Sequence, residues 1–274
     1  MRSAPGARAL AAVVLASALL AGCGGAVGSA DPRGGPAEHA ARSAKNPTYT
    51  ARPYRHWGLT APLPVPPSPP VRRPPRPAGD PLPVVQRVRT HHKVVFLTYD
   101  DGAEKDPRFV DMVRELRLPV SMFLTDSVVG PGYGHFARLR AVGASIQNHT
   151  LDHAALRGLP YAGQRAEICG QQNKLRARFG ILPRLFRPPY GRYDTTTLRA
   201  AADCGVTAVV LWRAAMEGDG ELTYAKGPVR LSAGDIVSVP SGEPAGLTLR
   251  ERTTRLLREI QGRGLTVGRL EDYI

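Results

Sequence analysis

Residues 94–102 read Val-Val-Phe-Leu-Thr-Tyr-Asp-Asp-Gly, an apolar run followed at once by two carboxylates and a glycine. An uninterrupted run of apolar and β-prone residues predicts a strand that is buried on both faces. Asp100 and Asp101 therefore stand where such a strand ends. On its own, an Asp-Asp-Gly after a strand is usually only a turn.

A pair of histidines suggests a metal-binding role for this turn. His149 and His153 stand four residues apart, about fifty residues further along the chain. One carboxylate and two imidazoles form the open ligand set of a catalytic zinc-type ion, which keeps a position for water or substrate. The second carboxylate is then free to take a proton from water. A lone His-x-x-x-His is more often an ordinary pair, but the two motifs together predict metal-assisted hydrolysis.

The N-terminus predicts export. A short basic region precedes a small apolar run at residues 9–20, which ends in Leu20-Ala21-Gly22-Cys23. The run is too short and too rich in alanine to favour a permanent span, so we interpret residues 1–22 as a signal peptide. Its end resembles the lipobox of bacterial lipoproteins, in which Cys23 is acylated. The domain would then be anchored by lipid to the outer, extracytoplasmic face of the bacterial membrane. The alternative is an ordinary cleaved signal with a chance cysteine.

Residues 23–90 carry almost no hydrophobic periodicity, and about half of residues 61–83 are proline. Such a composition buries too little apolar surface to fold. We therefore predict a disordered, Pro-rich spacer, extended at about 3.1 Å per residue, and a catalytic domain at residues 91–274. A linker without a spacing role is the alternative.

The charge distribution bears on partners. The formal net charge is +14, with 12 basic and 3 acidic residues in 1–90 against 25 and 20 in 91–274. Basicity near the anchor would favour anionic lipids or wall polymers, although coding bias explains it equally well. No zinc finger, helix-turn-helix or basic-aromatic array indicates a nucleic-acid partner. We expect a monomer.

Two cysteines remain besides Cys23: Cys169 and Cys204. Outside the cytoplasm, a leftover pair of this kind is expected to form a disulfide.

Beyond residue 93, apolar β-rich runs alternate with helical patterns at 106–118, 161–179 and 247–261. The predicted strands are 94–99, 120–124, 144–147, 184–187, 206–212, 235–239 and 265–270. This alternation predicts an α/β fold, a parallel barrel with its site at the C-terminal ends of the strands. Both motifs above stand at such ends, so we expect one shared site.

A third motif follows the fourth predicted strand, where residues 186–191 read Phe-Arg-Pro-Pro-Tyr-Gly. The two prolines stiffen the turn. The backbone N–H of Tyr190 could then point at a developing oxyanion, and Arg187 could hold a carboxylate with two hydrogen bonds. The alternative is a rigid loop with a surface arginine.

The three motifs together resemble the polysaccharide deacetylase family, the chitooligosaccharide deacetylase homology domain among carbohydrate esterases, over residues 93–274. The resemblance implies a distorted seven-stranded β/α barrel. It also implies removal of N-acetyl groups from aminosugars in chitin or peptidoglycan, or of O-acetyl groups in some members. The implied cofactor is a divalent metal, zinc first and cobalt as the alternative. The implied partner is an acetylated polysaccharide or peptidoglycan.

The same resemblance assigns roles by position. It implies that the metal ligands are three side chains: Asp101, His149 and His153. Asp100 would be the general base, Arg187 would orient it, and the Tyr190 amide would complete the oxyanion hole.

The C-terminal third departs from the family pattern. Family members have an Asp followed by Trp after the fifth strand, whereas no Trp follows Asp219. Where their late strand ends in a His that protonates the leaving amine, this chain has Pro240. Glu217, Asp219 and Glu243 are candidate replacements by proximity in sequence. General acid catalysis is worth about 10²–10⁴-fold, so the chain is either a slow enzyme or an impaired protein that binds metal and carbohydrate.

Overall fold

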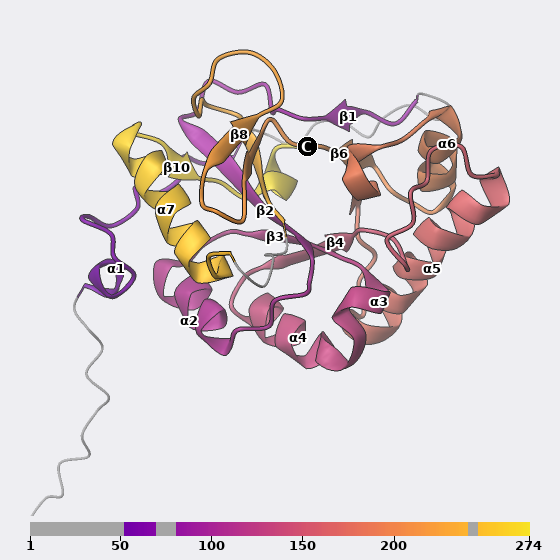
Figure 1. The fold of residues 1–274 in the computed structure, drawn as a ribbon, viewed down its shortest axis with the longest axis horizontal. Coiled ribbons are helices and arrows are strands. Elements are labelled where there is room, and N and C mark those ends of the chain that lie inside the picture. Colours follow the sequence, from indigo (N-terminus) through magenta and orange to yellow (C-terminus); the bar gives the residue numbers. More distant parts are fainter. Residues whose placement is uncertain (1–51, 70–80, 241–245) are drawn as a thin grey trace, which may run out of the picture. The chain divides into compact units, whose positions relative to one another are not determined.

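A curled, largely parallel sheet organises the chain (Figure 1). The computed structural model describes residues 52–69, 81–240 and 246–274. The strand order in these residues is β1-β6-β5-β4-β3-β2-β9-β7-β8, with β10 paired to β2. Every pair is parallel except β7 with β8. The strands are β1 (Val84–Val85), β2 (Val94–Asp101), β3 (Ser121–Leu124), β4 (Ser145–Asn148), β5 (Leu185–Phe186), β6 (Ala208–Val210), β7 (Ala214–Met216), β8 (Leu222–Tyr224), β9 (Ile236–Val239) and β10 (Thr266–Val267).

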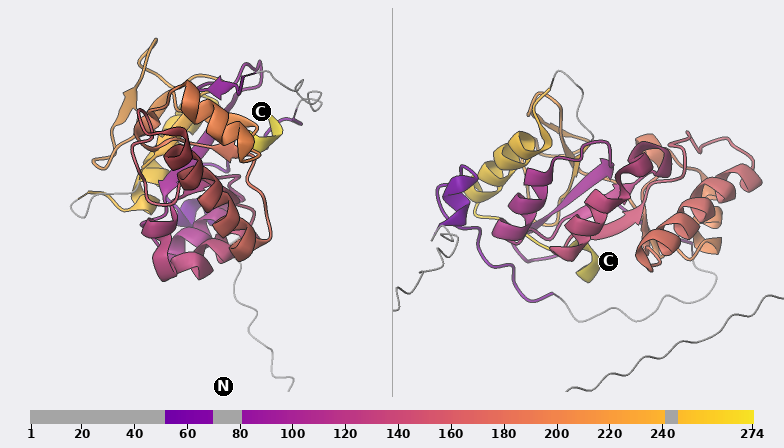
Figure 2. Two further views of the ribbon diagram at one scale, coloured as in Figure 1. Left: turned by 90° about the vertical axis from the view of Figure 1, so that its right-hand side faces the viewer. Right: turned by 90° about the horizontal axis from the view of Figure 1, so that it is seen from below.

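The helices form an arc around these strands (Figures 1 and 2). They are α1 (Pro53–His56), α2 (Pro107–Leu116), α3 (Asp126–Val129), α4 (Tyr133–Ala141), α5 (Tyr161–Phe179), α6 (Thr195–Asp203) and α7 (Leu249–Gly262), with short 3-10 turns η1 (Gly130–Gly132), η2 (Pro189–Gly191) and η3 (Leu270–Asp272). Within the described ranges, no helix has the length and apolar character needed to cross a bilayer.

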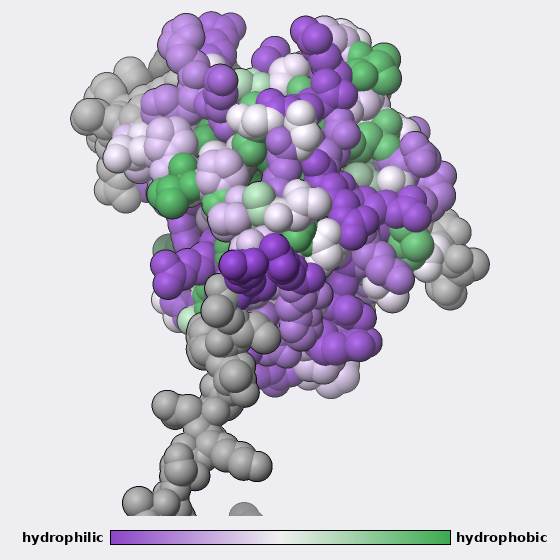
Figure 3. Space-filling model, turned by 90° about the vertical axis from the view of Figure 1, so that its left-hand side faces the viewer, coloured by the Kyte–Doolittle hydropathy of each residue, from purple (hydrophilic) through white to green (hydrophobic). Residues whose placement is uncertain are grey.

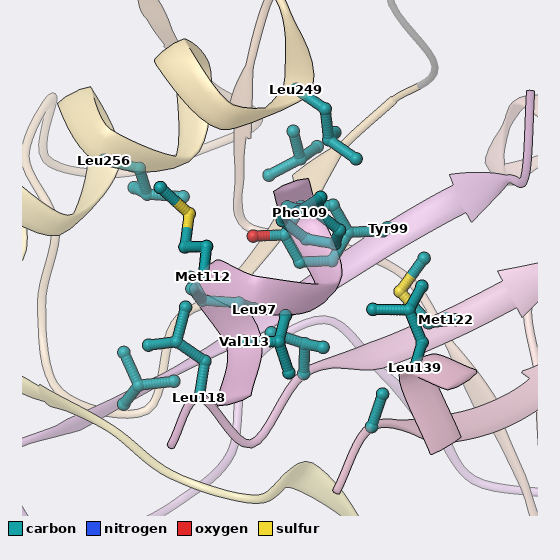
Figure 4. Packing of buried hydrophobic residues seen from close by; sticks show 14 of the residues in the cluster. Leu97, Tyr99, Phe109, Met112, Val113, Leu118, Met122, Leu139, Leu249 and Leu256 are labelled. Atoms are coloured by element: carbon teal, nitrogen blue, oxygen red, sulfur yellow. The ribbon is translucent and has the colours of Figure 1, made fainter. Parts of the chain in front are cut away.

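Helix α2 illustrates how local sequence produces these elements. Asp106 caps its N-terminus by accepting a hydrogen bond from the amide of Arg108, and a proline occupies the first turn. Phe109 and Met112 are fully buried on its inner face and belong to the same core as Tyr99 of β2 (Figure 4). Full burial of one such side chain stabilises the fold by about 1.5–3 kcal/mol. The core therefore fixes β2, which carries the first motif.

The seven predicted strands are confirmed to within a few residues, but the closed seven-stranded barrel is not what they form. The sheet is a curled half-barrel. A closed barrel would require β6 to pair with β7. Instead, the free edge of β6 is paired with β1, and the free edge of β7 is paired with antiparallel β8. Their ladder hydrogen bonds are thus already used. The chain itself joins the two sides, because only residues 211–213 separate β6 from β7.

The predicted disordered spacer extends too far toward the C-terminus. Residues 84–88 belong to the fold, since β1 pairs with β6 and Val88 is buried. Trp57 is also buried, and its indole N–H donates a hydrogen bond of 2.7 Å to Glu115. The prediction of disorder is wrong for these parts, because scattered apolar residues such as Trp57 and Val88 pack against the hydrophobic core. The predicted signal peptide, Cys23 and the rest of the predicted spacer lie within residues 1–51 and 70–80. These residues are outside the described part of the chain.

Residues 58–64, in the first described segment, lie along α7 and β10. Arg258 donates a hydrogen bond of 2.8 Å to the Gly58 carbonyl, and the Thr266 hydroxyl donates one to the Pro64 carbonyl. Seen from this side, the surface is mostly hydrophilic, with hydrophobic residues scattered in small groups (Figure 3). Proline-rich chain suits such a position, because it is already extended and loses little conformational freedom on docking.

A disulfide joins Cys169 in α5 to Cys204 at the end of α6, with their Cα atoms 5.0 Å apart. The predicted pairing is confirmed. In the chain-entropy treatment, closing a loop of 35 residues stabilises a fold by about 3–4 kcal/mol. The bond thus ties together the two helices beside β4 and β5, whose ends carry the second and third motifs.

Candidate active site

The first motif forms a tight turn at the C-terminal end of β2. Asp101 has a φ of 65°, and the amide of Gly102 donates a hydrogen bond of 2.8 Å to the Asp100 carbonyl. Gly102 has a φ of 85°, and a Cβ at this position would lie 2.9 Å from both Phe136 and Val129. Only glycine fits this conformation and space. The turn directs the two adjacent carboxylates into different surroundings.

The three side chains predicted to bind a metal converge. Asp101 Oδ1 lies 3.3 Å from His149 Nε2 and 3.2 Å from His153 Nε2. One potential ligand atom from each of the three lies within 4.8 Å of the others. His149 follows β4 directly and is 3% exposed, while the other two are partly exposed. The cluster therefore combines a fixed inner ligand with access from outside.

The hydrogen bonds of His149 indicate that this cluster suits a cation. Its Nδ1 lies 2.7 Å from the Arg187 carbonyl oxygen, which can only accept. Nδ1 must therefore carry a proton, and whenever the ring is neutral its Nε2 turns a lone pair toward Asp101. Among the described residues, no donor satisfies Asp101 Oδ1 with hydrogen-bond geometry, although it is buried. A divalent metal bound between these atoms would accept their lone pairs. A ligand set of one carboxylate oxygen and two imidazole nitrogens suits zinc.

The electrostatics favour the ligand form of Asp101. Burial alone would raise the pKa of its carboxyl group, but the facing imidazoles of His149 and His153 lower that pKa well below its usual range. Asp101 in turn raises the pKa of His153, against the effect of burial. Asp101 is consequently an anion throughout the neutral range, as metal binding requires.

Backbone strain concentrates at this site. Of the five non-glycine residues with positive φ in the described part of the chain, four belong to the motifs: Asp101, Thr150, His153 and Tyr190. Each such conformation costs roughly 1–3 kcal/mol and persists where its surroundings enforce it. Here Asn148 accepts a hydrogen bond from the Thr150 amide, and the Thr150 hydroxyl accepts one from the His153 amide. The loop is thereby held in the shape that brings both imidazoles to Asp101.

Arg187 is fully buried, so the alternative of a surface arginine is wrong. Its Nη1 donates a hydrogen bond of 2.6 Å to Asp100 Oδ1. Its Nε and Nη2 donate to the carbonyls of Val210 and Leu211. The guanidinium also stacks against an aromatic face, 4.5 Å from the ring centre of Phe123. Arg187 therefore contacts the carboxylate that it is predicted to orient.

Tyr190 lies on the open side of the site. The residue is 62% exposed, and its ring meets His153 edge-on, with ring centres 4.8 Å apart. No described backbone or side-chain group accepts a hydrogen bond from its amide. This donor is therefore available to a ligand beside the metal cluster.

Two neighbours of the site do not follow from the motifs. Ser238 donates a hydrogen bond of 2.7 Å to Asp100 Oδ2. Trp212 contacts Arg187, with the guanidinium carbon 5.4 Å from its ring centre, and a Cβ on Gly191 would lie 3.1 Å from its ring. The only sequence signals are a polar residue inside a buried strand and an aromatic residue at a strand end.

The candidate replacements for the missing acid lie in other interactions. Asp219 accepts a hydrogen bond from the Glu221 amide within the β7–β8 turn, and Glu217 accepts one from Thr223. Asp219 does not buttress Arg187, whose partners are Asp100 and backbone carbonyls. The Pro240 carbonyl accepts a hydrogen bond from Arg252. Glu243 lies outside the described residues.

Comparison with known proteins identifies the family. A family model for polysaccharide deacetylases matches residues 87–209, which contain all three motifs. An uncharacterized protein of Streptomyces coelicolor is 63% identical over 207 residues, which cover 72% of this chain and 83% of that protein. The chain belongs to the polysaccharide deacetylase family.

Two further comparisons are with a named enzyme and a solved structure. A chitin deacetylase of Amylomyces rouxii is 36% identical over 118 residues, which cover 42% of this chain and 27% of that enzyme. The aligned part of this chain thus spans only about a quarter of that enzyme's length. A solved pseudoenzyme of carbohydrate esterase family 4 from Bacillus anthracis superposes with a TM-score of 0.58 at 17% identity, over 69% of this chain and 68% of that one. This second likeness concerns the fold.

Proposed function

We propose that the protein is a metal-dependent hydrolase that removes acetyl groups from aminosugar polysaccharides such as peptidoglycan. The observation that carries the proposal is the convergence of Asp101, His149 and His153 next to the pair formed by Asp100 and Arg187. A divalent metal, zinc first and cobalt as the alternative, would supply Lewis-acid activation of water and of the acetyl carbonyl.

The proposed roles of the chain's own residues follow from their contacts. Asp100 takes the proton of the attacking water, while a new C–O bond forms at the acetyl carbon. Arg187 fixes one oxygen of Asp100 with a hydrogen bond. The Tyr190 amide donates a hydrogen bond to the carbonyl oxygen as negative charge develops there. The C–N bond then breaks, and the leaving nitrogen needs a proton.

No described side chain is assigned to protonate the leaving nitrogen, so this step should limit the proposed reaction. Pro240 occupies the position of the family's acid and has no proton to give. We therefore expect slow turnover of N-acetyl substrates and less impairment with O-acetyl substrates, because an alkoxide leaves more readily than an amide anion. A catalytically impaired metal- and carbohydrate-binding protein is the second candidate. It is favoured by Pro240.

Assays of the wild type and of Pro240→His test this proposal. With zinc or cobalt added, the wild type should deacetylate N-acetylglucosamine oligomers slowly. Pro240→His should raise that rate by up to about 10²-fold, the lower end of what a general acid contributes. Pro240→Ala is the matched control, since it removes the ring without adding an acid. No turnover of N- or O-acetylated glycans by any variant that binds metal would favour the impaired protein.

We also propose that Cys23 is lipidated and holds a monomeric domain on the outer face of the bacterial membrane. Support comes from the apolar run ending in Leu20-Ala21-Gly22-Cys23. Cys23→Ala should move the protein from the membrane fraction to the soluble fraction, whereas Cys169→Ala should not. Unchanged fractionation of Cys23→Ala would contradict a lipid anchor.

A further inference from the structure

Ser238 is a polar residue in the middle of an otherwise apolar strand. The other residues of β9 are Ile236, Val237 and Val239, and all four are buried. Ser238 is 3% exposed. A buried hydroxyl costs free energy unless it forms a hydrogen bond. A serine is therefore tolerated in this buried strand because its hydroxyl has a hydrogen-bond partner.

That partner is the second oxygen of Asp100. The hydroxyl of Ser238 donates a hydrogen bond of 2.7 Å to Asp100 Oδ2, while Arg187 donates one of 2.6 Å to Oδ1. Donors thus approach the carboxylate from β9 on one side and from the end of β5 on the other. The torsion of a free aspartate about its Cβ–Cγ bond is broad, and two such bonds restrict it.

Strand register places the hydroxyl beneath the carboxylate. Ser238 pairs with Thr98 across β2 and β9. Residues two apart on a strand share a face, so Asp100 stands one pleat further toward the open end than Thr98. The hydroxyl of Thr98 is already used by the Val237 carbonyl. On the other side Ser238 pairs with Ala215, whose methyl group offers no competing acceptor.

We propose that Ser238 is a positioning residue that aims the Asp100 carboxylate at the attacking water. It acts through Asp100 and does not itself contact the substrate. The inference rests on the proposed function for the role of Asp100, but the hydrogen bond can be tested without turnover. A small misplacement of a catalytic group can cost about 10²-fold in rate.

Kinetics of Ser238→Ala and Ser238→Thr test the proposal. Ser238→Ala should lower kcat by about 10–10²-fold and leave KM and the zinc dissociation constant within twofold of the wild type. Ser238→Thr keeps the hydroxyl in a β-branched side chain that suits a strand, and it should regain most of the lost kcat. Wild-type kcat in Ser238→Ala would overturn the inference. So would a loss of kcat that Ser238→Thr does not relieve while both variants melt at the wild-type temperature.

A double-mutant cycle supplies the readout that needs no reaction. The shifts in denaturant midpoint caused by Ser238→Ala and Asp100→Ala should be less than additive, because each removes the same hydrogen bond. Additive shifts would overturn the contact. If no variant turns over any substrate, the proposed function fails, and this cycle alone decides whether Ser238 holds Asp100.

Discussion

Replacing His149 with alanine should weaken zinc binding by about 10²–10³-fold, roughly the share of one ligand in the binding free energy of a zinc site. Deacetylation should fall to background at the same time, since Lewis-acid activation is lost with the metal. His149 is the most buried member of the cluster, and its Nδ1 contact with the Arg187 carbonyl fixes the direction of Nε2. Among the described residues, the cluster contains no fourth His, Cys, Asp or Glu that could replace it.

Calorimetric titration of chelator-treated protein with zinc measures this effect directly. His91→Ala is the matched control, because it removes an exposed imidazole outside the site. It should leave the dissociation constant unchanged. Zinc binding by His149→Ala at wild-type affinity would show that the metal binds elsewhere.

Asp100→Asn should lower kcat by about 10²–10⁴-fold, the usual contribution of a general base, while zinc still binds. Asparagine keeps the shape of the side chain but cannot take a proton from water. It also leaves the guanidinium of Arg187, which is fully buried, without a counter-charge. Breaking a buried ion pair in this way costs about 3–5 kcal/mol, so the free energy of unfolding should fall as well.

Initial rates, zinc titrations and denaturant midpoints should be measured on the same preparations. Asp152→Asn removes an exposed carboxylate from the histidine loop and serves as the control, with rate and stability near wild type. An Asp100→Asn protein that keeps more than a tenth of the wild-type kcat would exclude Asp100 as the base.

Much of the site could be predicted because its chemistry sits in short motifs. The apolar run before Asp100 and Asp101 indicates a strand end, and the spacing of His149 and His153 indicates a ligand pair. Two parallel strand ends meet at one edge of a sheet, which is sufficient to expect one site. The structure brings the two motifs together, since one candidate ligand atom from each of the three residues lies within 4.8 Å of the others.

The parts that could not be predicted depend on distant pairing. Residues 214–216 read Ala-Ala-Met, which have no strong β propensity, and they become β7 only because β9 and β8 pair with them. Trp57 stands in a segment without hydrophobic periodicity, and only the folded domain shows that it is buried. Ser238 is likewise unremarkable until the register places it under Asp100.

The short strand β1 also has a consequence for the protein's behaviour in solution. An uncovered sheet edge pairs readily with the edge of another molecule, which leads to aggregation. The inner side of the β1 segment is used, because the Pro83 carbonyl accepts a hydrogen bond from the Val209 amide. As a strand the segment is only two residues long, so it offers few free backbone groups to a further strand. This very short strand thus ends the sheet with an edge that resists extension by a second molecule.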